Sequence, residues 1–208
     1  MRKTVTPGGE AKPRRNNDLF QKRQMQIIRK ATKLFVKKGY AQTSMREISK
    51  ATGIDIRNLY YFIKSKDEIL FLVMEMIHQR EIELFEKQGI MDIDDPVSQL
   101  RAVIHGLIDN GYGYGEEILL LYRESKSLSK RLLKIILARE SQVVAQIEEI
   151  LKEGIRREVF HFKDASFTAN MIVYELSVHA LRKWNLKNYS KDELINLIEG
   201  HVMKAVMG

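Results

Sequence analysis

Apolar residues recur with the spacing of an α-helix along almost the whole chain, and few residues interrupt that pattern. Only three prolines occur among the 208 residues, at positions 7, 13 and 96, so proline breaks hardly any periodic segment. No stretch of useful length alternates apolar and polar residues as a half-buried strand would. The sequence therefore predicts an all-α fold of about nine helices. The expected helices cover residues 18–39, 44–52, 55–62, 66–87, 96–110, 116–126, 128–159, 163–185 and 190–206.

Residues 43–66 are expected to form two short helices joined by a tight turn. Ser44, or the threonine before it, can cap the first helix, and Glu47 completes a capping-box pattern. Gly53 supplies the turn, and Asp55 caps the second helix. The side chains expected to face inward are those of Met45, Ile48, Ala51, Leu59 and Phe62. This arrangement is typical of a helix-turn-helix that enters DNA.

The charge of the chain is unevenly distributed. Residues 1–66 contain 17 Lys and Arg against four Asp and Glu, whereas residues 67–208 contain 18 against 23. A basic first third joined to a mildly acidic remainder indicates a polyanionic partner for the first part alone. We therefore expect a disordered basic tail at residues 1–17, a DNA-binding domain at 18–66 and a larger domain at 67–208.

The same stretch resembles the TetR family of bacterial transcriptional regulators. The residues that match the family pattern are Thr43, Ser44, Arg46, Ile48, Ala51, Gly53, Ile54, Leu59, Tyr60, Phe62, Ser65, Lys66 and Ile69. The segment IRKATKLFVKKGY, Ile28–Tyr40, is similar to the family's first helix. Two departures occur: Asp55 stands where the family often has serine, and Ile63–Lys64 replaces a common Phe-Pro. Asp and Ser both cap helices, so the second helix is expected to persist.

A recognition helix must be anchored on one side and bare on the other. Within Asp55–Phe62, four side chains are free to reach base edges: Ile56, Arg57, Asn58 and Tyr61. Arg57 suits guanine and Asn58 suits adenine, through paired hydrogen bonds. The resemblance adds phosphate contacts and further DNA-side residues, namely Thr43, Ser44, Arg46, Tyr60, Lys64 and Lys66. Core packing of either tyrosine, and a merely solvated Arg57, are the alternatives.

The resemblance implies that residues 67–208 bind an effector and form a homodimer through the last two helices. Their apolar stripes comprise Phe167, Met171, Leu176, Val178 and Leu181, and Leu194, Ile195, Ile198, Val202 and Val206. The operator is then roughly palindromic double-stranded DNA. Effector binding is expected to shift the helix at residues 66–87 and to release DNA, with repression as the family default. The segment GYGYG at residues 111–115 is expected to be a flexible joint, since glycine weakens helix interiors.

The candidate pocket residues are polar or aromatic and come from several helices. They are His105, Tyr112, Tyr122, Arg123, Asn170, Tyr174, His179 and Trp184. Packing is the alternative for Tyr174 and Trp184, and a core or dimer-interface position is the alternative for His179. Leu119–Leu128 and the exit YYFIKSKDEIL resemble members that respond to fatty acyl or acyl-CoA compounds, so a small hydrophobic effector is expected. Arg123, or the basic cluster at residues 126, 130 and 131, would meet an anionic head group, unless these are simply surface charges.

Two other functions compete with this interpretation. An all-α enzyme finds no support, because metalloprotease, phosphate-loop and nucleophile-elbow motifs are absent, and the five histidines lie far apart. A non-specific architectural DNA-binding protein would leave the acidic remainder without a role. With no cysteine there are no disulfides or thiolate metal sites, and no apolar run reaches the roughly 18 residues of a membrane span. We expect a cytoplasmic protein without catalytic residues, bound metal, cofactor or membrane contact.

Overall fold

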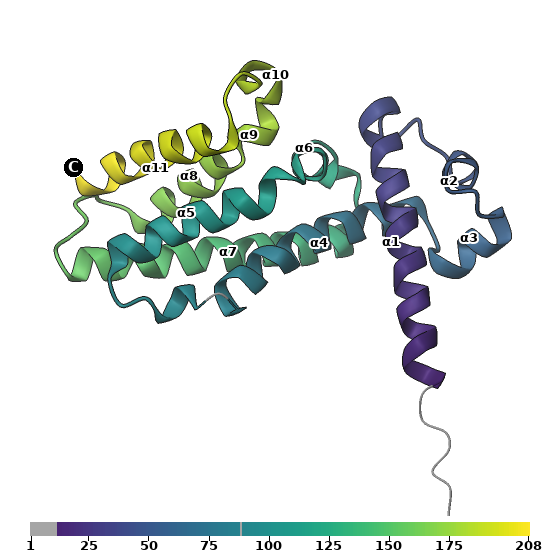
Figure 1. The fold of residues 1–208 in the computed structure, drawn as a ribbon, viewed down its shortest axis with the longest axis horizontal. Coiled ribbons are helices and arrows are strands. Elements are labelled where there is room, and N and C mark those ends of the chain that lie inside the picture. Colours follow the sequence, from purple (N-terminus) through teal and green to yellow (C-terminus); the bar gives the residue numbers. More distant parts are fainter. Residues whose placement is uncertain (1–11, 88) are drawn as a thin grey trace, which may run out of the picture. The chain divides into compact units, whose positions relative to one another are not determined.

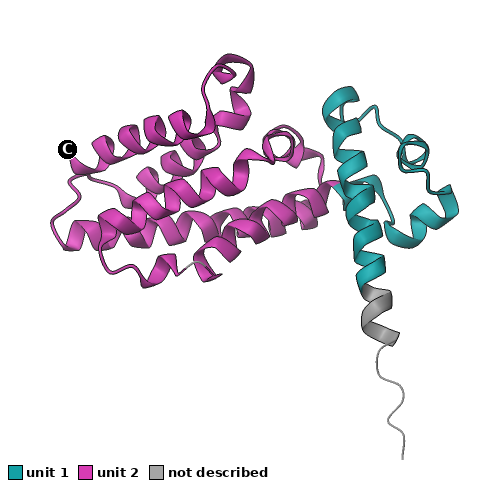
Figure 2. Cartoon of the chain, viewed as in Figure 1, with its two compact units in different colours: residues 1–69 teal, residues 70–208 magenta. Residues whose placement is uncertain are grey.

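The structure is a computed structural model that describes residues 12–87 and 89–208, with side chains from residue 18 onward. Every regular element in these ranges is helical (Figure 1). Nine of the eleven α-helices have seven or more residues, and the other two have four each. The predicted all-α fold of about nine helices is confirmed. The chain divides into unit 1, which ends at Ile69, and unit 2, Leu70–Gly208 (Figure 2). We describe each unit separately.

Unit 1 contains α1 (Lys12–Lys38), α2 (Met45–Thr52) and α3 (Ile56–Phe62). The Ser44 hydroxyl accepts from the Glu47 amide, and the Glu47 carboxylate accepts from the Ser44 amide, as the capping-box pattern predicts. Gly53 ends α2 in the left-handed conformation, with φ 72°, which glycine adopts at no steric cost. The two short helices are held by fully buried apolar side chains, namely Ile27, Ala31, Phe35, Ile48, Leu59 and Ile63.

The first helix begins at Lys12, six residues before its predicted start at Asp18. Residues 12–17 are therefore helical and do not belong to the expected tail, whose residues 1–11 lie outside the described ranges. Because of Pro13, the prediction placed the start of the helix too late in the sequence. A proline in the first turn removes only an amide that has no partner within the helix, so it is compatible with a helix start.

Unit 2 is a bundle built around long helices. Helix α4 (Lys66–Lys87) leads from unit 1 into it, and Ser65 caps α4 by accepting from the Glu68 amide at 3.1 Å. After a 3₁₀ turn at Ile90–Asp92 come α5 (Pro96–Tyr112), α6 (Gly115–Glu124), a second 3₁₀ turn at Ser125–Ser127, and α7 (Lys130–Arg156). The chain ends in α8 (Ala165–Leu176), α9 (Val178–Leu181), α10 (Lys183–Leu186) and α11 (Lys191–Met207).

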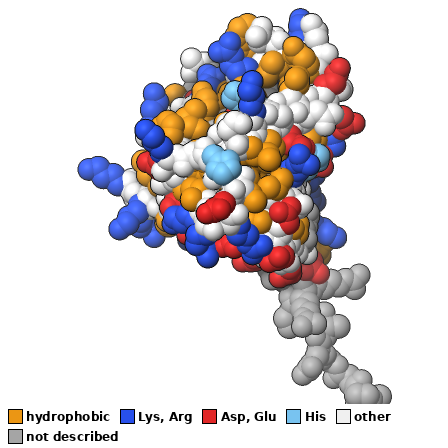
Figure 3. All heavy atoms as spheres, turned by 90° about the vertical axis from the view of Figure 1, so that its left-hand side faces the viewer, with side chains coloured by type: hydrophobic (Ala, Val, Ile, Leu, Met, Phe, Trp, Pro, Cys, Tyr) orange, Lys and Arg blue, Asp and Glu red, His pale blue; other side chains and the backbone are white. Residues whose placement is uncertain are grey.

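The core of unit 2 lies where α7 packs against α5 and α8, and where α11 packs against α5 and α8. Its members include Leu84, Phe85, Leu100, Ile104, Ile108, Val143, Ile147, Ile150, Phe160, Ile172, Ile198 and Val202. Much of the apolar stripe predicted for dimer contact is buried in this core. The stripe residues that remain strongly exposed are Phe167 at 65% and Met171 at 48%. At the end of unit 2 where α11 stops, hydrophobic side chains lie between charged ones (Figure 3).

The predicted single helix at residues 163–185 is wrong, because the chain forms α8, α9 and α10 there. Two side chains take carbonyl oxygens that a continuous helix would give to later amides. His179 Nδ1 lies 2.9 Å from the Leu176 oxygen, and the Ser177 hydroxyl donates to the Val173 oxygen at 3.2 Å. The Ala180 amide bonds to the Ser177 oxygen instead of that of Leu176. The helix therefore ends at Leu176.

The segment GYGYG is only partly a break. Gly111 and Tyr112 belong to α5, and α6 begins at Gly115, so the interruption is confined to Gly113 and Tyr114. A Cβ on Gly111 would lie 3.2 Å from Ile118 Cδ1, which is tight. Gly111 is thus tolerated inside the helix because a side chain of α6 packs close to it.

Within the described ranges, every helix is too short or too polar to cross a lipid bilayer.

The end of α7 depends on a glycine. The Val159 amide bonds to the Gly154 oxygen and the Glu158 amide to that of Ile155, while Glu158 has φ 58°, which is a Schellman-type C-terminus. The turn places the Phe160 ring over Gly154, where an added Cβ would lie 1.9 Å from Phe160 Cδ2. The chain can reverse here only because residue 154 has no side chain.

We predict that Gly154→Ala lowers the free energy of unfolding by about 1–3 kcal/mol, because the buried Phe160 ring must move. Gly113→Ala is the matched control, since nothing lies within 4 Å of its added Cβ and its φ of −76° suits alanine. The control should be neutral or stabilised by up to about 1 kcal/mol. Urea unfolding of both variants checks this, and equal stability of the two would contradict the packing argument.

Candidate functional site

Helix α3 presents a bare face on an anchored helix. Leu59 and the following Ile63 are fully buried, while Arg57 and Asn58 are exposed and Ile56 is half-buried. Tyr60 is 49% exposed and Tyr61 74%, so neither packs in the core. The structure therefore brings the predicted base-reading residues and Tyr60 together on the outer side of α3. Exposed Lys64 follows directly, and Arg46 is exposed on α2.

The aromatic ring of Phe20 on α1 supports the end of α3. The Phe20 ring lies 5.2 Å from that of Phe62 and 5.8 Å from that of Tyr61, the latter edge-on. Gln24 Nε2 donates to the Phe62 oxygen at 3.2 Å. Edge-to-face aromatic pairs favour one ring orientation over others. The Tyr61 ring is therefore held in place although most of its surface is exposed.

Three of the predicted DNA contacts use their polar groups inside the unit. The Lys66 ammonium donates to the oxygens of Tyr40 at 2.8 Å and Ala41 at 3.3 Å, and lies 4.3 Å from the centre of the Tyr40 ring. The Thr43 hydroxyl, on a residue only 2% exposed, donates to the Gly39 oxygen. Ser44 is occupied as the cap of α2. These side chains fix the loop before α2 and the start of α4.

The helix-cap carboxylate Glu47 is held in its charged form. Its hydrogen bond with Lys38, together with those from Ser44, lowers the pKa of Glu47 from 4.5 to about 2. The ion pair joins the last turn of α1 to the first turn of α2. The orientation of α2 therefore rests on a charged contact as well as on apolar packing.

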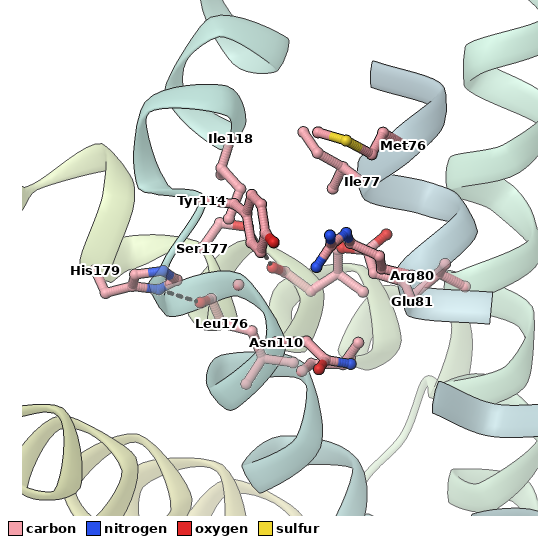
Figure 4. A pocket seen from close by; sticks show the side chains of 14 residues that line it. Met76, Ile77, Arg80, Glu81, Asn110, Tyr114, Ile118, Leu176, Ser177 and His179 are labelled. Atoms are coloured by element: carbon pink, nitrogen blue, oxygen red, sulfur yellow. Dashed lines mark hydrogen bonds between the residues drawn. The ribbon is translucent and has the colours of Figure 1, made fainter. Parts of the chain in front are cut away.

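A second candidate site is a pocket inside unit 2, lined by residues of α4, α5, α6, α7, α8 and α9 (Figure 4). Its wall is mostly apolar, with Ile77, Leu107, Ile118, Val143 and Leu176 among its residues. About 40 Å³ is accessible to water-sized molecules, far less than the roughly 300–1,000 Å³ typical of ligand pockets. Any ligand beyond a few atoms must therefore displace side chains.

The polar groups of the pocket lie on two sides of it. Arg80 and Glu81 of α4 lie opposite His179, with Tyr114 between them (Figure 4). The Arg80 guanidinium lies 4.0 Å from the centre of the Tyr114 ring, a cation–π contact. Asn110 and Ser177 complete the polar lining. Arg80 and Asn110 also border a neighbouring surface groove with Lys87, so they stand between the pocket and solvent.

Of the eight predicted pocket residues, only His179 lines this pocket. Tyr112 stacks on the His179 ring with 5.7 Å between centres, and Tyr122 donates to the Ser177 hydroxyl at 3.3 Å. The other five lie at the surface of unit 2. His105 pairs with Glu199, Asn170 bonds to the Ser166 oxygen, Tyr174 meets the Tyr122 ring, Trp184 lies beside Arg182, and Arg123 is exposed.

A cluster of charged side chains around the buried His78 connects α4 to α7 next to the pocket. His78 is 1% exposed; its Nδ1 lies 3.0 Å from Glu81 and its Nε2 3.5 Å from Glu140. Arg139 Nε lies 3.2 Å from the Glu75 carboxylate. Burial by itself lowers the pKa of His78, but the hydrogen bond to Glu81 and the three carboxylates outweigh it, so that pKa is raised. Burial raises the pKa of Glu140.

The residues predicted from the sequence to form a site do not include His78, Arg80 or Glu81 of α4. The spacing of His78 and Glu81, three residues apart, places them on one helix face and was a usable signal. Tyr114 lies in the glycine-rich segment at residues 111–115, for which the sequence predicts a flexible joint and no pocket residue.

Comparison with known proteins agrees with this architecture. Residues 27–73 match the model for bacterial regulatory proteins of the tetR family, and residues 94–184 match the tetracyclin repressor-like C-terminal domain. The chain is 25% identical over 185 residues to the HTH-type transcriptional regulator HbdR of Aromatoleum, covering 87% of this chain and 76% of that protein. It is 24% identical over 136 residues to the HTH-type transcriptional repressor NicS of Pseudomonas putida, covering 64% of each.

Solved structures share the fold. A TetR family regulator from Rhodococcus superposes with a TM-score of 0.82 at 19% identity, over 89% of this chain and 97% of that one. AibR, solved with isovaleryl coenzyme A and operator DNA, superposes with a TM-score of 0.76 at 24% identity, over 86% and 97%. PfmR from Thermus thermophilus gives 0.73 at 22% identity, over 88% and 97%.

We predict that the stability of unit 2 falls as pH rises above neutrality. The folded pKa of His78 exceeds its ordinary value of 6.5, so its charged form stabilises the fold fully below that value, and the contribution is lost as pH rises through the folded pKa. Urea unfolding between pH 6 and 9 measures this. His78→Gln should flatten the decline, whereas His161→Gln, at an exposed position, should leave it unchanged. An unaltered pH profile in His78→Gln would contradict the assignment.

Proposed function

The chain belongs to the tetR family of bacterial regulatory proteins, and from this premise we propose that it represses transcription from a palindromic operator as a homodimer and is released by a small hydrophobic effector. The family consists of transcriptional regulators, so the chain is a regulator and not an enzyme. The observation that carries the proposal is the outer face of α3. There, Arg57, Asn58, Tyr60 and Tyr61 are exposed while Leu59 is buried.

A short anchored helix with a bare polar face can enter the major groove of DNA. Arg57 can pair with the O6 and N7 of guanine, and Asn58 with the N6 and N7 of adenine. Tyr60, Lys64 and Arg46 then supply donors to phosphates, which position the helix without reading sequence. Lys66 and Thr43 act instead by holding the segments that flank α2 and α3, through the hydrogen bonds described above.

The dimer proposal rests on an uncovered apolar face. Phe167, Met171 and Tyr174 lie at i, i+4 and i+7 of α8 and are 65%, 48% and 55% exposed. Leu197 on the adjacent α11 is 57% exposed. Large apolar side chains grouped on two neighbouring helices are typical of a protein interface. We assign this face to the contact with a second copy of the chain, which supplies the second recognition helix for a palindrome.

The effector proposal rests on the pocket beside α4. Because the pocket is nearly filled, a ligand must displace side chains of α4 such as Met76 or Arg80. Helix α4 begins with Lys66, whose ammonium holds the loop before α2, so movement of α4 would reach the DNA-binding unit along the helix itself. A ligand releases DNA only to the extent that it binds the released state more tightly. The apolar lining fits an aliphatic group, including the acyl part of a fatty acid or acyl-CoA.

We predict that Arg57→Ala weakens binding to a selected operator by about 1–3 kcal/mol, because the guanine contact is lost. The operator is first obtained by selecting bound DNA from a random pool, and affinities are then measured by electrophoretic mobility shift. Arg29→Ala, an exposed arginine on α1, is the matched control. Arg29→Ala should reduce the affinity for operator DNA and for random DNA by the same factor. If Arg57→Ala lowers the affinity for both DNAs equally, Arg57 contacts phosphates and does not read a base. If the selection enriches no sequence, a non-specific architectural role is favoured.

We further predict that Phe167→Lys weakens dimerisation at least about tenfold, as expected when a large interface side chain is replaced by a charge. Analytical ultracentrifugation across micromolar concentrations measures the change. Leu137→Lys on α7, where the side chain is 55% exposed, is the control and should remain dimeric. A wild-type chain that stays monomeric at these concentrations would refute the dimer.

A further inference from the structure

One ring nitrogen of His179 has a hydrogen-bond partner and the other has none among the described residues. Its ring is 6% exposed, and Nδ1 lies 2.9 Å from the Leu176 oxygen. A carbonyl oxygen can only accept, so Nδ1 carries a proton and donates it. In the neutral ring the other nitrogen, Nε2, is then an acceptor. Nε2 is buried and has no hydrogen-bond partner among the described residues.

The surroundings of the ring leave Nε2 open to the pocket. The Tyr112 ring stacks on one face of the imidazole. On the side of α5, the edge of the ring lies close to Gly111, where an added Cβ would be 3.8 Å from Nε2, an ordinary van der Waals contact without a hydrogen-bond donor. His179 lines the pocket together with Gly111 and Ile118. A buried acceptor without a donor is costly, by an amount comparable to a lost hydrogen bond. A ligand that brings a donor removes that cost.

The other polar groups on this side do not supply the donor. The Ser177 hydroxyl gives its only proton to the Val173 oxygen and already accepts from Tyr122. Across the pocket, Glu81 is a further acceptor, engaged with His78. Arg80, which has five donors, lies on the far side against the Tyr114 ring. Asn110 and Tyr114 also line the pocket and carry donors, but neither forms a hydrogen bond with Nε2. The acceptor at Nε2 is therefore left for a ligand.

We propose that the effector is a small, mainly aliphatic molecule with one hydrogen-bond donor, an alcohol or an N–H amide, which binds Nε2 of His179. This inference rests on the proposed function, because it specifies the ligand of the same pocket. The apolar body contacts Ile77, Ile118 and Leu176, and the donor hydrogen bonds to the imidazole nitrogen. The small volume of the pocket favours short chains, because each added methylene must displace more of the wall.

The test compares isomeric probes on the full-length chain. Hexan-1-ol donates and accepts a hydrogen bond, whereas its isomer methyl pentyl ether can only accept. Hexanoate tests the opposite possibility, that the site prefers an anion facing Arg80 or a doubly protonated His179. Binding is measured by NMR titration at millimolar probe. We expect hexan-1-ol to bind roughly three- to tenfold more tightly than the ether, the range for one hydrogen bond.

Two variants separate recognition from folding. His179→Asn places an amide near the Nδ1 position, retaining a donor for the Leu176 oxygen but removing Nε2. His179→Gln reaches toward the Nε2 position, where its amide oxygen can accept, but does not reproduce the Nδ1 contact. We expect the alcohol-over-ether preference to vanish in His179→Asn and to be partly retained in His179→Gln. Thermal unfolding of each variant shows whether the fold persists.

Operator binding in the same samples distinguishes the two proposals. Equal affinity for alcohol and ether, preference for hexanoate, or no binding of any probe overturns the donor inference. If ether and alcohol both release operator DNA equally, the proposed regulator function is supported, but the inference that the effector donates a hydrogen bond is overturned. Selective binding of hexan-1-ol that depends on His179 but never alters operator affinity confirms the site and contradicts the proposed coupling. A preference for alcohol that persists in a folded His179→Asn also overturns the role of Nε2.

Discussion

The carbonyl oxygen of Leu176 can accept from the Ala180 amide or from the His179 ring, and in this chain the ring takes it. That choice ends α8, turns the chain into α9, and places the imidazole against the pocket. Competition between the His179 side chain and the Ala180 amide for one carbonyl oxygen thus determines where α8 ends and which polar group lines the pocket.

Helix α4 combines tasks that are separate in the sequence. Its first residue, Lys66, binds the oxygens of Tyr40 and Ala41, and its middle turns carry the buried His78 and the half-buried Glu81, which meet Glu140 of α7. Removing the carboxylates would leave His78 buried without a charged partner. The proposed ligand pocket, the His78 cluster and the contact of Lys66 with the loop before α2 therefore all involve residues of a single helix.

Local signals were sufficient for much of the fold. The capping box at Ser44, the glycine turn at Gly53 and the anchoring of α3 by Leu59 follow from spacing and residue type, and each appears as predicted. The misses have a common physical origin. The role of Lys66, the break at Ser177 and the position of Tyr114 depend on contacts between residues far apart in the chain or on competing hydrogen bonds, which periodicity does not encode. Seven of the eight expected pocket residues do not line this pocket for the same reason: polar and aromatic side chains on a helix give no sign of which helix will cover them.

The small volume of the pocket has a consequence for how such a sensor is tuned. Space for only a few atoms is accessible in this structure, so the proposed effector requires a more open arrangement of the pocket wall. The apparent dissociation constant then equals the intrinsic one divided by the fraction of open molecules. Substitutions that weaken or strengthen the contact between Arg80 and Tyr114 would change the fraction of open molecules. They would thereby shift the effector concentration needed for release of DNA, without altering any ligand contact. Sensitivity and selectivity can thus be adjusted by different residues.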